Sequence, residues 1–380
     1  MSDCIFDYLK WRGDLSFTAV PANEIDYAIL AQIAYCPFEK LEKGFKGKTL
    51  GKINPLLYTE EKSDSSWEWQ KKLRLLWKEI TNCPRYANLK LADFKSVFKP
   101  EEDTQFAVAT FAIGTTAIVA YRGTDLSIVG WRENFRLGYE SPVPAQSLAV
   151  EYLNKLPEKY TAVYLCGHSK GGNLAMYAAS HCKKKARIKE IYNFDGPGLD
   201  DDTLQSKGWK QAEKKLKSFV PEASVVGMLL GYALNYTIVD ADSISILQHN
   251  NFNWRLDGPH FKEAENLTTS SVLLSKAVHG LLREISVEER KVFILALFKI
   301  LEASECTRSD EVLKMLVKNL PAIIKTGNNL SVEEKEILDK VQSVFIGYLT
   351  SGAKLRAELE IYKSRQKIKG LFKGKKEEKA

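Results

Sequence analysis

The pattern of apolar and polar positions divides the chain into a first part of mixed helices and strands and a last part of helices alone. Apolar residues at helical spacing predict helices over residues 27–35, 67–81, 147–156 and 172–182. Alternating or fully apolar runs predict strands over residues 106–111, 117–121, 162–166, 188–194, 216–220, 236–239 and 244–247. The strand–helix–strand alternation in the middle of the chain favours a mostly parallel sheet covered by helices.

Local signals refine this division. Asn23 followed by Asp26 is typical of a helix start, whereas the polar segment 43–66 reads as a loop. From about residue 271 the pattern is wholly helical, with capping boxes at Ser286 with Glu289 and at Ser331 with Glu334, and a simpler N-cap at Ser309. We therefore predict an α/β domain over 1–280, a helical appendage over 281–362 and a basic, disordered tail over 363–380.

Composition fits a globular protein. The 380 residues are 44% hydrophobic and 11% aromatic, enough to fill a substantial core. Residues 362–380 carry eight Lys or Arg and two Glu, so they hold +6 of the net charge of +7. Because the charge belongs to a tail, we expect no nucleic-acid partner, and at most a weak contact of the tail with an anionic membrane surface.

The cysteines and the chain's first residues bear on location. Six cysteines are scattered without paired spacing, as in proteins that keep their thiols reduced. The first residues lack the apolar core of a secretory signal, and the longest apolar stretches are well short of the roughly 20 residues that span a bilayer. We expect a cytoplasmic protein. We also expect no cofactor, because the sequence shows no metal cluster, dinucleotide-binding glycine pattern or P-loop.

The clearest chemical signal is a Gly-x-Ser-x-Gly motif centred on Ser169. It follows the apolar strand predicted over 162–166 and immediately precedes a helix. A serine nucleophile has to stand clear at the end of a buried strand, on a tight turn that only small neighbours permit. The start of the helix adds free N–H groups and a positive dipole end for a developing oxyanion. The motif predicts Ser169 as a nucleophile.

A second motif, Arg122-Gly123-Thr124-Asp125, follows the strand predicted over 117–121 and precedes Trp131 and Asn134. Together with Gly-His-Ser-x-Gly-Gly it resembles the class 3 (fungal-type) lipases. More closely, the chain is similar to the Mbeg1-like family of bacterial proteins, over roughly residues 5–260. The segments that carry this resemblance also include residues 8–14, 194–198, 224–230, 248–250 and Trp254.

The resemblance implies an α/β-hydrolase fold and a pair of oxyanion-hole donors. The residue after Arg-Gly, Thr124, would supply one, and the backbone N–H of Lys170 would supply the other. The lipases usually carry an apolar residue at the position of Lys170. We expect its side chain either to add a cation at the mouth of the site or to be solvated without a substrate role.

A serine nucleophile also needs a base, and five histidines compete for this role. In this fold the chain order is nucleophile, acid, histidine, with the histidine in a loop after the last strand. His249 occupies that place and lies in the Gln-His-Asn motif of the resemblance, so we favour it over His260, which lies in a turn. We expect His168 to be structural and His181 to cap its helix or face solvent, while His279 lies outside the matched region.

The acid is less clear from sequence. Class 3 lipases carry an Asp at the position that Ser224 occupies here, and Glu222 stands two residues earlier. Asp195, at the end of the preceding strand, is the other candidate, although it could simply cap its own turn. We favour Asp195 over Glu222 and place Asp240 and Asp242 third.

These residues predict a serine hydrolase of the lipase or esterase type, acting on a small-molecule or lipid ester through an acyl-enzyme. The apolar segment 225–234 is either a helix that lines an acyl pocket or lid, or part of the core. The alternative function is a non-catalytic binding or membrane-surface protein that keeps the fold. It rests on the missing lipase Asp and on the helical appendage with its basic tail.

Overall fold

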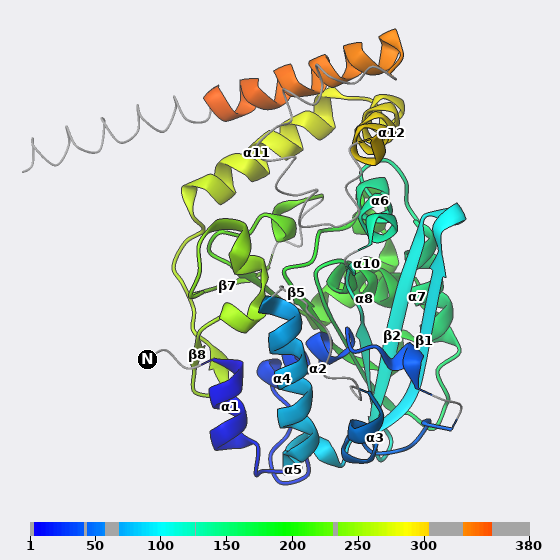
Figure 1. Cartoon of the computed structure of the whole chain (residues 1–380), viewed down its shortest axis with the longest axis vertical. Coiled ribbons are helices and arrows are strands. Elements are labelled where there is room, and N and C mark those ends of the chain that lie inside the picture. The colour runs from blue at the N-terminus through cyan, green and yellow to red at the C-terminus, as the bar shows by residue number, and fades with distance from the viewer. Residues whose placement is uncertain are drawn as a thin grey trace, which may run out of the picture.

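The computed structural model describes residues 4–41, 44–57, 68–125, 127–230, 235–303 and 330–351. At its centre is a seven-stranded sheet in which the strands follow one another in chain order (Figure 1). The first two neighbouring pairs are antiparallel and the other four are parallel. The strands are β1 (Lys90–Lys99), β2 (Thr104–Ile113), β3 (Thr116–Tyr121), β4 (Ala162–His168), β5 (Ile188–Phe194), β6 (Leu216–Pro221) and β7 (Thr237–Val239).

Helices cover both faces of the sheet because its central strands are apolar on both sides. One buried cluster joins alternate residues of the central strands to α7 and α8, and another joins the intervening residues to α2 and α4. The helices are α1 (Ile5–Arg12), α2 (Glu24–Ile33), α3 (Leu50–Leu57), α4 (Glu68–Asn82), α5 (Pro84–Ala87), α6 (Ile128–Arg136), α7 (Pro144–Asn154), α8 (Lys170–His181), α9 (Asp201–Gln205), α10 (Lys207–Ala212), α11 (Thr269–Glu284) and α12 (Val287–Ala303).

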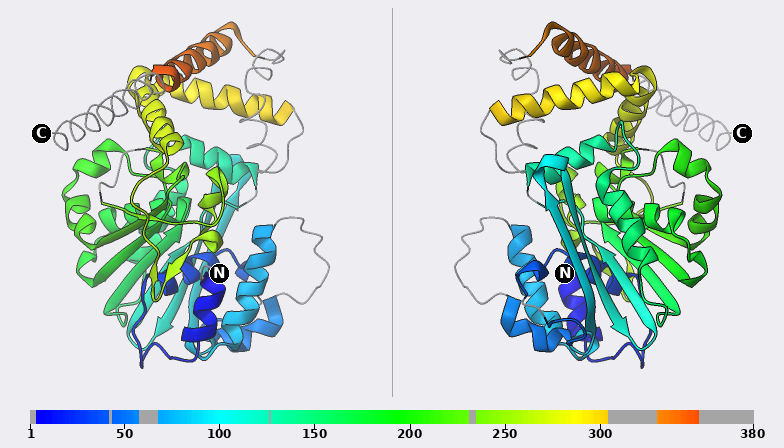
Figure 2. Two further views of the ribbon diagram at one scale, coloured as in Figure 1. Left: turned by 90° about the vertical axis from the view of Figure 1, so that its left-hand side faces the viewer. Right: turned by 90° about the vertical axis from the view of Figure 1, so that its right-hand side faces the viewer.

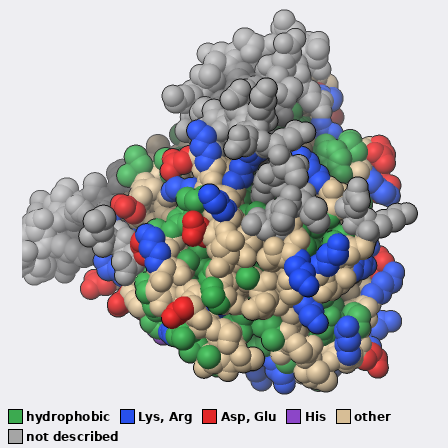
Figure 3. All heavy atoms as spheres, turned by 60° about the horizontal axis from the view of Figure 1, so that its bottom comes forward, with side chains coloured by type: hydrophobic (Ala, Val, Ile, Leu, Met, Phe, Trp, Pro, Cys, Tyr) green, Lys and Arg blue, Asp and Glu red, His purple; other side chains and the backbone are tan. Residues whose placement is uncertain are grey.

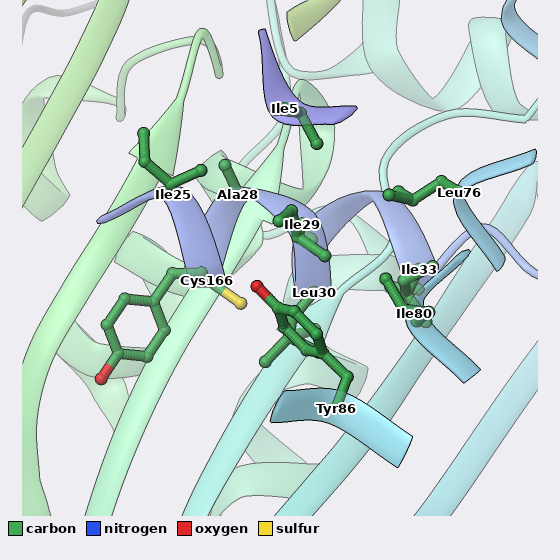
Figure 4. Packing of buried hydrophobic residues seen from close by; sticks show 14 of the residues in the cluster. Ile5, Ile25, Ala28, Ile29, Leu30, Ile33, Leu76, Ile80, Tyr86 and Cys166 are labelled. Atoms are coloured by element: carbon green, nitrogen blue, oxygen red, sulfur yellow. The ribbon is translucent and has the colours of Figure 1, made fainter. Parts of the chain in front are cut away.

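Helix α2 is buried at every residue after Glu24. Figure 4 shows its apolar side chains between Cys166 of β4 on one side and Leu76 and Ile80 of α4 on the other. The predicted capping box is present, since the Asn23 side chain accepts from the second and third N–H groups of the helix and Asp26 accepts from the N–H of Asn23. The Asp26 carboxylate also forms a fully buried ion pair with Arg85, which ties α2 to α5.

The C-terminal helices lie together at one end of the molecule (Figure 2). Helix α12 packs on α6 through an apolar cluster that includes Phe135 and Phe298, and residues 332–351 form a further helix. Both predicted capping boxes, at Ser286 and Ser331, are formed. Ser309 and the basic tail over 363–380 lie outside the described residues, and the predicted boundary near residue 280 falls within α11.

The expected α/β fold, a mostly parallel sheet flanked by helices with a helical C-terminal part, is confirmed. Several elements differ from the sequence prediction. Strand β1 and helix α1 were not predicted, and α3 occupies part of the predicted loop 43–66. Residues 244–247 are not a strand, because a 3₁₀ helix, η6, spans Ser245–His249. Segment 225–234 contains only a 3₁₀ turn, η5 (Val226–Met228), in its described part.

The surface is mixed in character. On the face drawn in Figure 3, hydrophobic side chains lie in small separate groups among Lys and Arg side chains. In the part of the chain that the structure describes, no helix combines the length and apolar character that crossing a membrane requires.

Candidate active site

Ser169 occupies a strained turn between β4, which ends at His168, and α8, which begins at Lys170. Its backbone has φ 58° and ψ −133°, a conformation that L-residues rarely adopt. The N–H of Ser169 donates to the carbonyl of Phe194 on β5 (3.0 Å), which holds the turn against the neighbouring strand. The partly exposed serine therefore stands at the carboxyl end of the parallel strands, as a nucleophile elbow requires.

The glycines around Ser169 allow the strand and the helix to approach closely. A Cβ atom on Gly171 would lie 2.1 Å from the carbonyl oxygen of Tyr121, and one on Gly167 would lie 2.1 Å from the carbonyl carbon of Gly171. Both contacts are with backbone atoms, which cannot move aside as a flexible side chain can. The small residues of the motif are thus required by the packing of β3, β4 and α8.

His249 and Asp195 form a hydrogen-bonded pair beside this turn. The Asp195 carboxylate is fully buried and its Oδ2 accepts a hydrogen bond from His249 Nδ1 at 2.7 Å. Its other oxygen accepts from the Ser224 hydroxyl and from the N–H of Gly227 (3.1 Å). The His249 side chain is 23% exposed. An imidazole that donates through Nδ1 presents Nε2 as its free base nitrogen.

Among the carboxylates considered from sequence, Asp195 is the one that the structure brings to His249. Ser224, at the position where lipases carry their Asp, donates to Asp195. Among the described residues no hydrogen bond or ion pair joins Glu222 to His249, and the backbone N–H of Glu222 donates to the carbonyl of Val239. Asp240 and Asp242 both pair with Arg255 instead.

The other histidines lie apart from this pair, except His168. His260 is exposed and contacts Glu24 (3.2 Å), His181 bonds the carbonyl of Tyr177 (3.0 Å), and His279 lies near the carbonyl of Leu230 (3.3 Å).

His168 contacts His249 directly. Its Nε2 lies 2.7 Å from the carbonyl oxygen of His249, and its ring lies against the His249 ring with centroids 4.6 Å apart. Since a carbonyl can only accept, Nε2 of His168 carries the proton, and Nδ1 can accept from the Tyr35 hydroxyl (3.3 Å). Burial, and then the neighbouring His249, lower the pKa of His168 to about 3, so this ring is neutral at physiological pH.

The expected oxyanion-hole residues lie on two segments that flank the elbow. The Thr124 hydroxyl accepts a hydrogen bond from the side chain of Asn134 on α6. Lys170 is the first residue of α8, where backbone N–H groups have no partner within the helix. Both expectations for its side chain were wrong: it is 1% exposed and pairs with Glu133 (2.8 Å), so its cation neither faces the mouth of the site nor is solvated.

No metal site accompanies this arrangement within the described ranges, where no group of three or more His, Cys, Asp or Glu side chains is placed to hold an ion. What the residues can do chemically is proton transfer and nucleophilic attack, with a base that is oriented by a buried carboxylate.

Comparison with known proteins places the chain in a family. A family model described as Mbeg1-like matches residues 80–299, which is more than half of the chain. The chain belongs to the Mbeg1-like family. No curated protein matches it in sequence. Among solved structures it is similar to the crystal structure of M37 lipase, with 14% identity, a TM-score of 0.32, and coverage of 55% of this chain and 69% of that one.

The Mbeg1-like segment contains Thr124, Ser169, Asp195 and His249, whereas Tyr35 lies outside it. Sequence reasoning missed Tyr35, Gln105 and Glu133, which contact His168 or Lys170. One signal could have pointed to Glu133, because a lysine at position 170 needs a buried counter-charge if its side chain points inward. No comparable signal marks Tyr35 or Gln105.

Proposed function

We propose that this Mbeg1-like protein is a serine hydrolase that cleaves a carboxylic ester, of a lipid or of a small molecule, through an acyl-enzyme on Ser169. The observation that carries the proposal is the 2.7 Å contact between His249 Nδ1 and the buried Asp195 carboxylate, next to the strained elbow at Ser169. A serine on such a turn, a histidine beside it and a carboxylate behind the histidine are the three groups that acyl transfer by serine needs.

Each residue has a definite task in this reaction. Asp195 holds His249 in the tautomer whose Nε2 is unprotonated, and His249 takes the proton from Ser169 as the hydroxyl oxygen attacks the ester carbonyl. The N–H groups of Thr124 and Lys170 stabilise the negative charge that develops on the carbonyl oxygen. Collapse of the intermediate releases the alcohol, which receives the proton from His249. Water then attacks the acyl-enzyme with His249 as base, and the carboxylic acid leaves.

Two features support this choice of nucleophile and substrate. Cys166 precedes the elbow, but burial raises the pKa of its thiol, which disfavours a thiolate nucleophile there. Two apolar side chains are exposed on the segment that carries His249: Ile244, just before η6, is 77% exposed, and Leu247, within η6, is 61% exposed. Exposed apolar side chains next to the base suit the acyl chain of a lipid ester.

The proposal is tested by labelling with a fluorophosphonate, a probe that reacts with activated serines, and by turnover of p-nitrophenyl esters of increasing acyl length. We expect the wild-type chain to be labelled and to hydrolyse the esters. Ser169→Ala and His249→Ala should abolish both signals, since a nucleophile and its base act as a unit. His260→Ala is the matched control and should keep them. Wild-type protein that shows neither signal, or labelling that persists in Ser169→Ala, contradicts the proposal.

The alternative, a non-catalytic protein that keeps the fold, loses one of its two grounds. It rested partly on the missing Asp at Ser224, but Asp195 provides a carboxylate to His249 from the neighbouring strand. Its other ground is the helical appendage with its basic tail, and of these the tail lies outside the described residues. Absence of every Ser169-dependent signal in the experiment above is the outcome that favours this alternative.

A further inference from the structure

A buried polar cluster lies beneath the elbow and consists of Lys170, Gln105 and Glu133. Lys170 Nζ donates to the Glu133 carboxylate (2.8 Å), to the backbone carbonyl of Gln105 (2.6 Å) and to the Gln105 side-chain oxygen (2.7 Å). An ammonium group has three protons, so every donor of this lysine is used. The three side chains are 1%, 3% and 0% exposed, respectively.

The Gln105 side chain connects this cluster to the other oxyanion segment. Because its Oε1 faces the Lys170 ammonium, which can only donate, the amide orientation is determined and Nε2 points to the carbonyl oxygen of Gly123 (3.4 Å). The carbonyl of Gly123 and the N–H of Thr124 belong to one planar, trans peptide unit. A hydrogen bond that fixes the carbonyl on one side therefore fixes the direction of the Thr124 N–H on the opposite side.

Glu133 limits the freedom of this arrangement. Besides Lys170, its carboxylate accepts from the N–H of Gln105 (3.1 Å) and from the N–H of Ala145 (2.9 Å). The Gln105 side chain is also closely packed against Gly130 of α6. A Cβ on Gly130 would lie 3.0 Å from Gln105 Oε1 and 3.0 Å from a side-chain carbon of Thr124. Buried charges are costly unless they are paired and fully hydrogen-bonded, so a cluster of this kind has one favourable geometry.

We propose that Gln105 is a positioning residue for the oxyanion hole: its side chain links Lys170 to the peptide unit of Thr124 and thereby sets the relative placement of the two N–H donors. This inference rests on the proposed function. Gln105 touches no reacting atom. Its effect is on the transition state, because the donors must point to where the oxyanion forms and not to where the ground-state carbonyl lies.

The test uses the full chain with Gln105→Met, which removes the side-chain link but keeps the Lys170–Glu133 ion pair and the backbone bonds of residue 105. Removal of a whole oxyanion donor costs about 10²–10³ in kcat, so misplacement of one should lower kcat by roughly tenfold or more. KM should stay within about twofold, since ground-state binding is not affected. Affinity for a trifluoromethyl ketone, which forms an oxyanion on the serine, should fall in parallel with kcat.

Gln105→Leu is a second variant for the case in which Gln105→Met does not fold. It also lacks the donor to the Gly123 carbonyl and adds no charge to the buried cluster, so kcat should fall here as well. Thr110→Val is the matched control. Thr110 lies on the same strand as Gln105 but away from the site, and the change removes its buried hydrogen bond to Tyr152 of α7. Its thermal stability should fall, with kcat and ketone affinity unchanged.

The outcomes separate this inference from the proposed function. If the wild type is active and the Gln105 variants keep wild-type kcat, or lose no more kcat than Thr110→Val does, the role of Gln105 is overturned while the proposed function stands. A wild type without any Ser169-dependent turnover overturns the proposed function, and this inference with it.

Discussion

The Asp195 carboxylate is held by three donors from two segments of the chain, the one that follows β6 and the one that carries His249. His249, Ser224 and the N–H of Gly227 all bond its oxygens, and its backbone N–H bonds Phe219 (2.8 Å). A group restrained in this way keeps one orientation, and that orientation decides which nitrogen of His249 carries a proton. The choice between Asp195 and Glu222 as the acid can therefore be tested by changing each carboxylate to its amide.

Asp195→Asn should lower kcat by about 10⁴-fold, as the same change does in the Ser-His-Asp triad of serine proteases. An amide that donates to Nδ1 of His249 leaves the proton on Nε2, where the base has to be free. Glu222→Gln, a change of the same kind on the other candidate, should leave kcat within about twofold of the wild type. Ester turnover and fluorophosphonate labelling of both variants measure this difference. A large loss in Glu222→Gln with an active Asp195→Asn would assign the acid to Glu222.

At this scale the sequence indicates some site residues and not others. The glycines of the Gly-x-Ser-x-Gly motif indicate Ser169, and chain order together with the resemblance indicates His249. Asp195 could only be one of several candidates, because its contact with His249 spans 54 residues of sequence. Gln105 and Glu133 lie 65 and 37 residues from Lys170 and belong to no motif, so only the fold brings them together.

Among the elements, those around the elbow were the most predictable. Strand β4 and helix α8 have apolar runs whose period is unambiguous, and both are buried. Strand β1 was missed because it is an edge strand with exposed or half-buried residues at most positions, so its apolar pattern is weak. The run 244–247 looked like a strand because Ile244 and Leu247 are apolar, yet both side chains are exposed and pack against no sheet.

The close packing at the elbow predicts a large effect of one methyl group. In Gly171→Ala the added Cβ would meet the carbonyl of Tyr121 at 2.1 Å, so β3 and α8 have to separate. Overpacking of this kind costs typically about 1–3 kcal/mol of unfolding free energy. Gly347→Ala is the same change in the helix over 332–351, where nothing lies near the added atom, and it should be neutral or stabilising. Urea unfolding of both variants checks this; equal stabilities would contradict the close approach.

In the molecule as a whole, two of the C-terminal helices contact segments that flank the candidate site. Ser271 of α11 donates to the carbonyl of Ser224, whose hydroxyl bonds Asp195. Helix α12 packs on α6, which carries both Glu133 and Asn134. The sequence predicted these helices from their caps, but their attachment depends on scattered contacts that no local pattern indicates. The division into a domain over 1–280 and an appendage stays a prediction.

The pH dependence of global stability should reflect His168. Its pKa is about 6.5 in the unfolded chain and about 3 in the folded one. The stability that comes from burying the neutral ring is complete above about pH 6.5 and is lost as pH falls toward 3, by up to about 1.4 kcal/mol per pH unit. In His168→Gln this slope should decrease, whereas the exposed His181→Gln should retain it. Urea unfolding between pH 7 and pH 5 measures the slopes, and equal slopes in all three proteins would exclude this origin.

The ion pair between Lys170 and Glu133 also constrains how such a chain can change over generations. Loss of either partner leaves a charge without compensation in the interior, which costs about 3–5 kcal/mol and is a large part of the stability of a typical domain. A chain with neither charge could not gain them one at a time, in either order, without an intermediate that carries an unpaired buried charge. The two positions are therefore expected to be inherited, and lost, together.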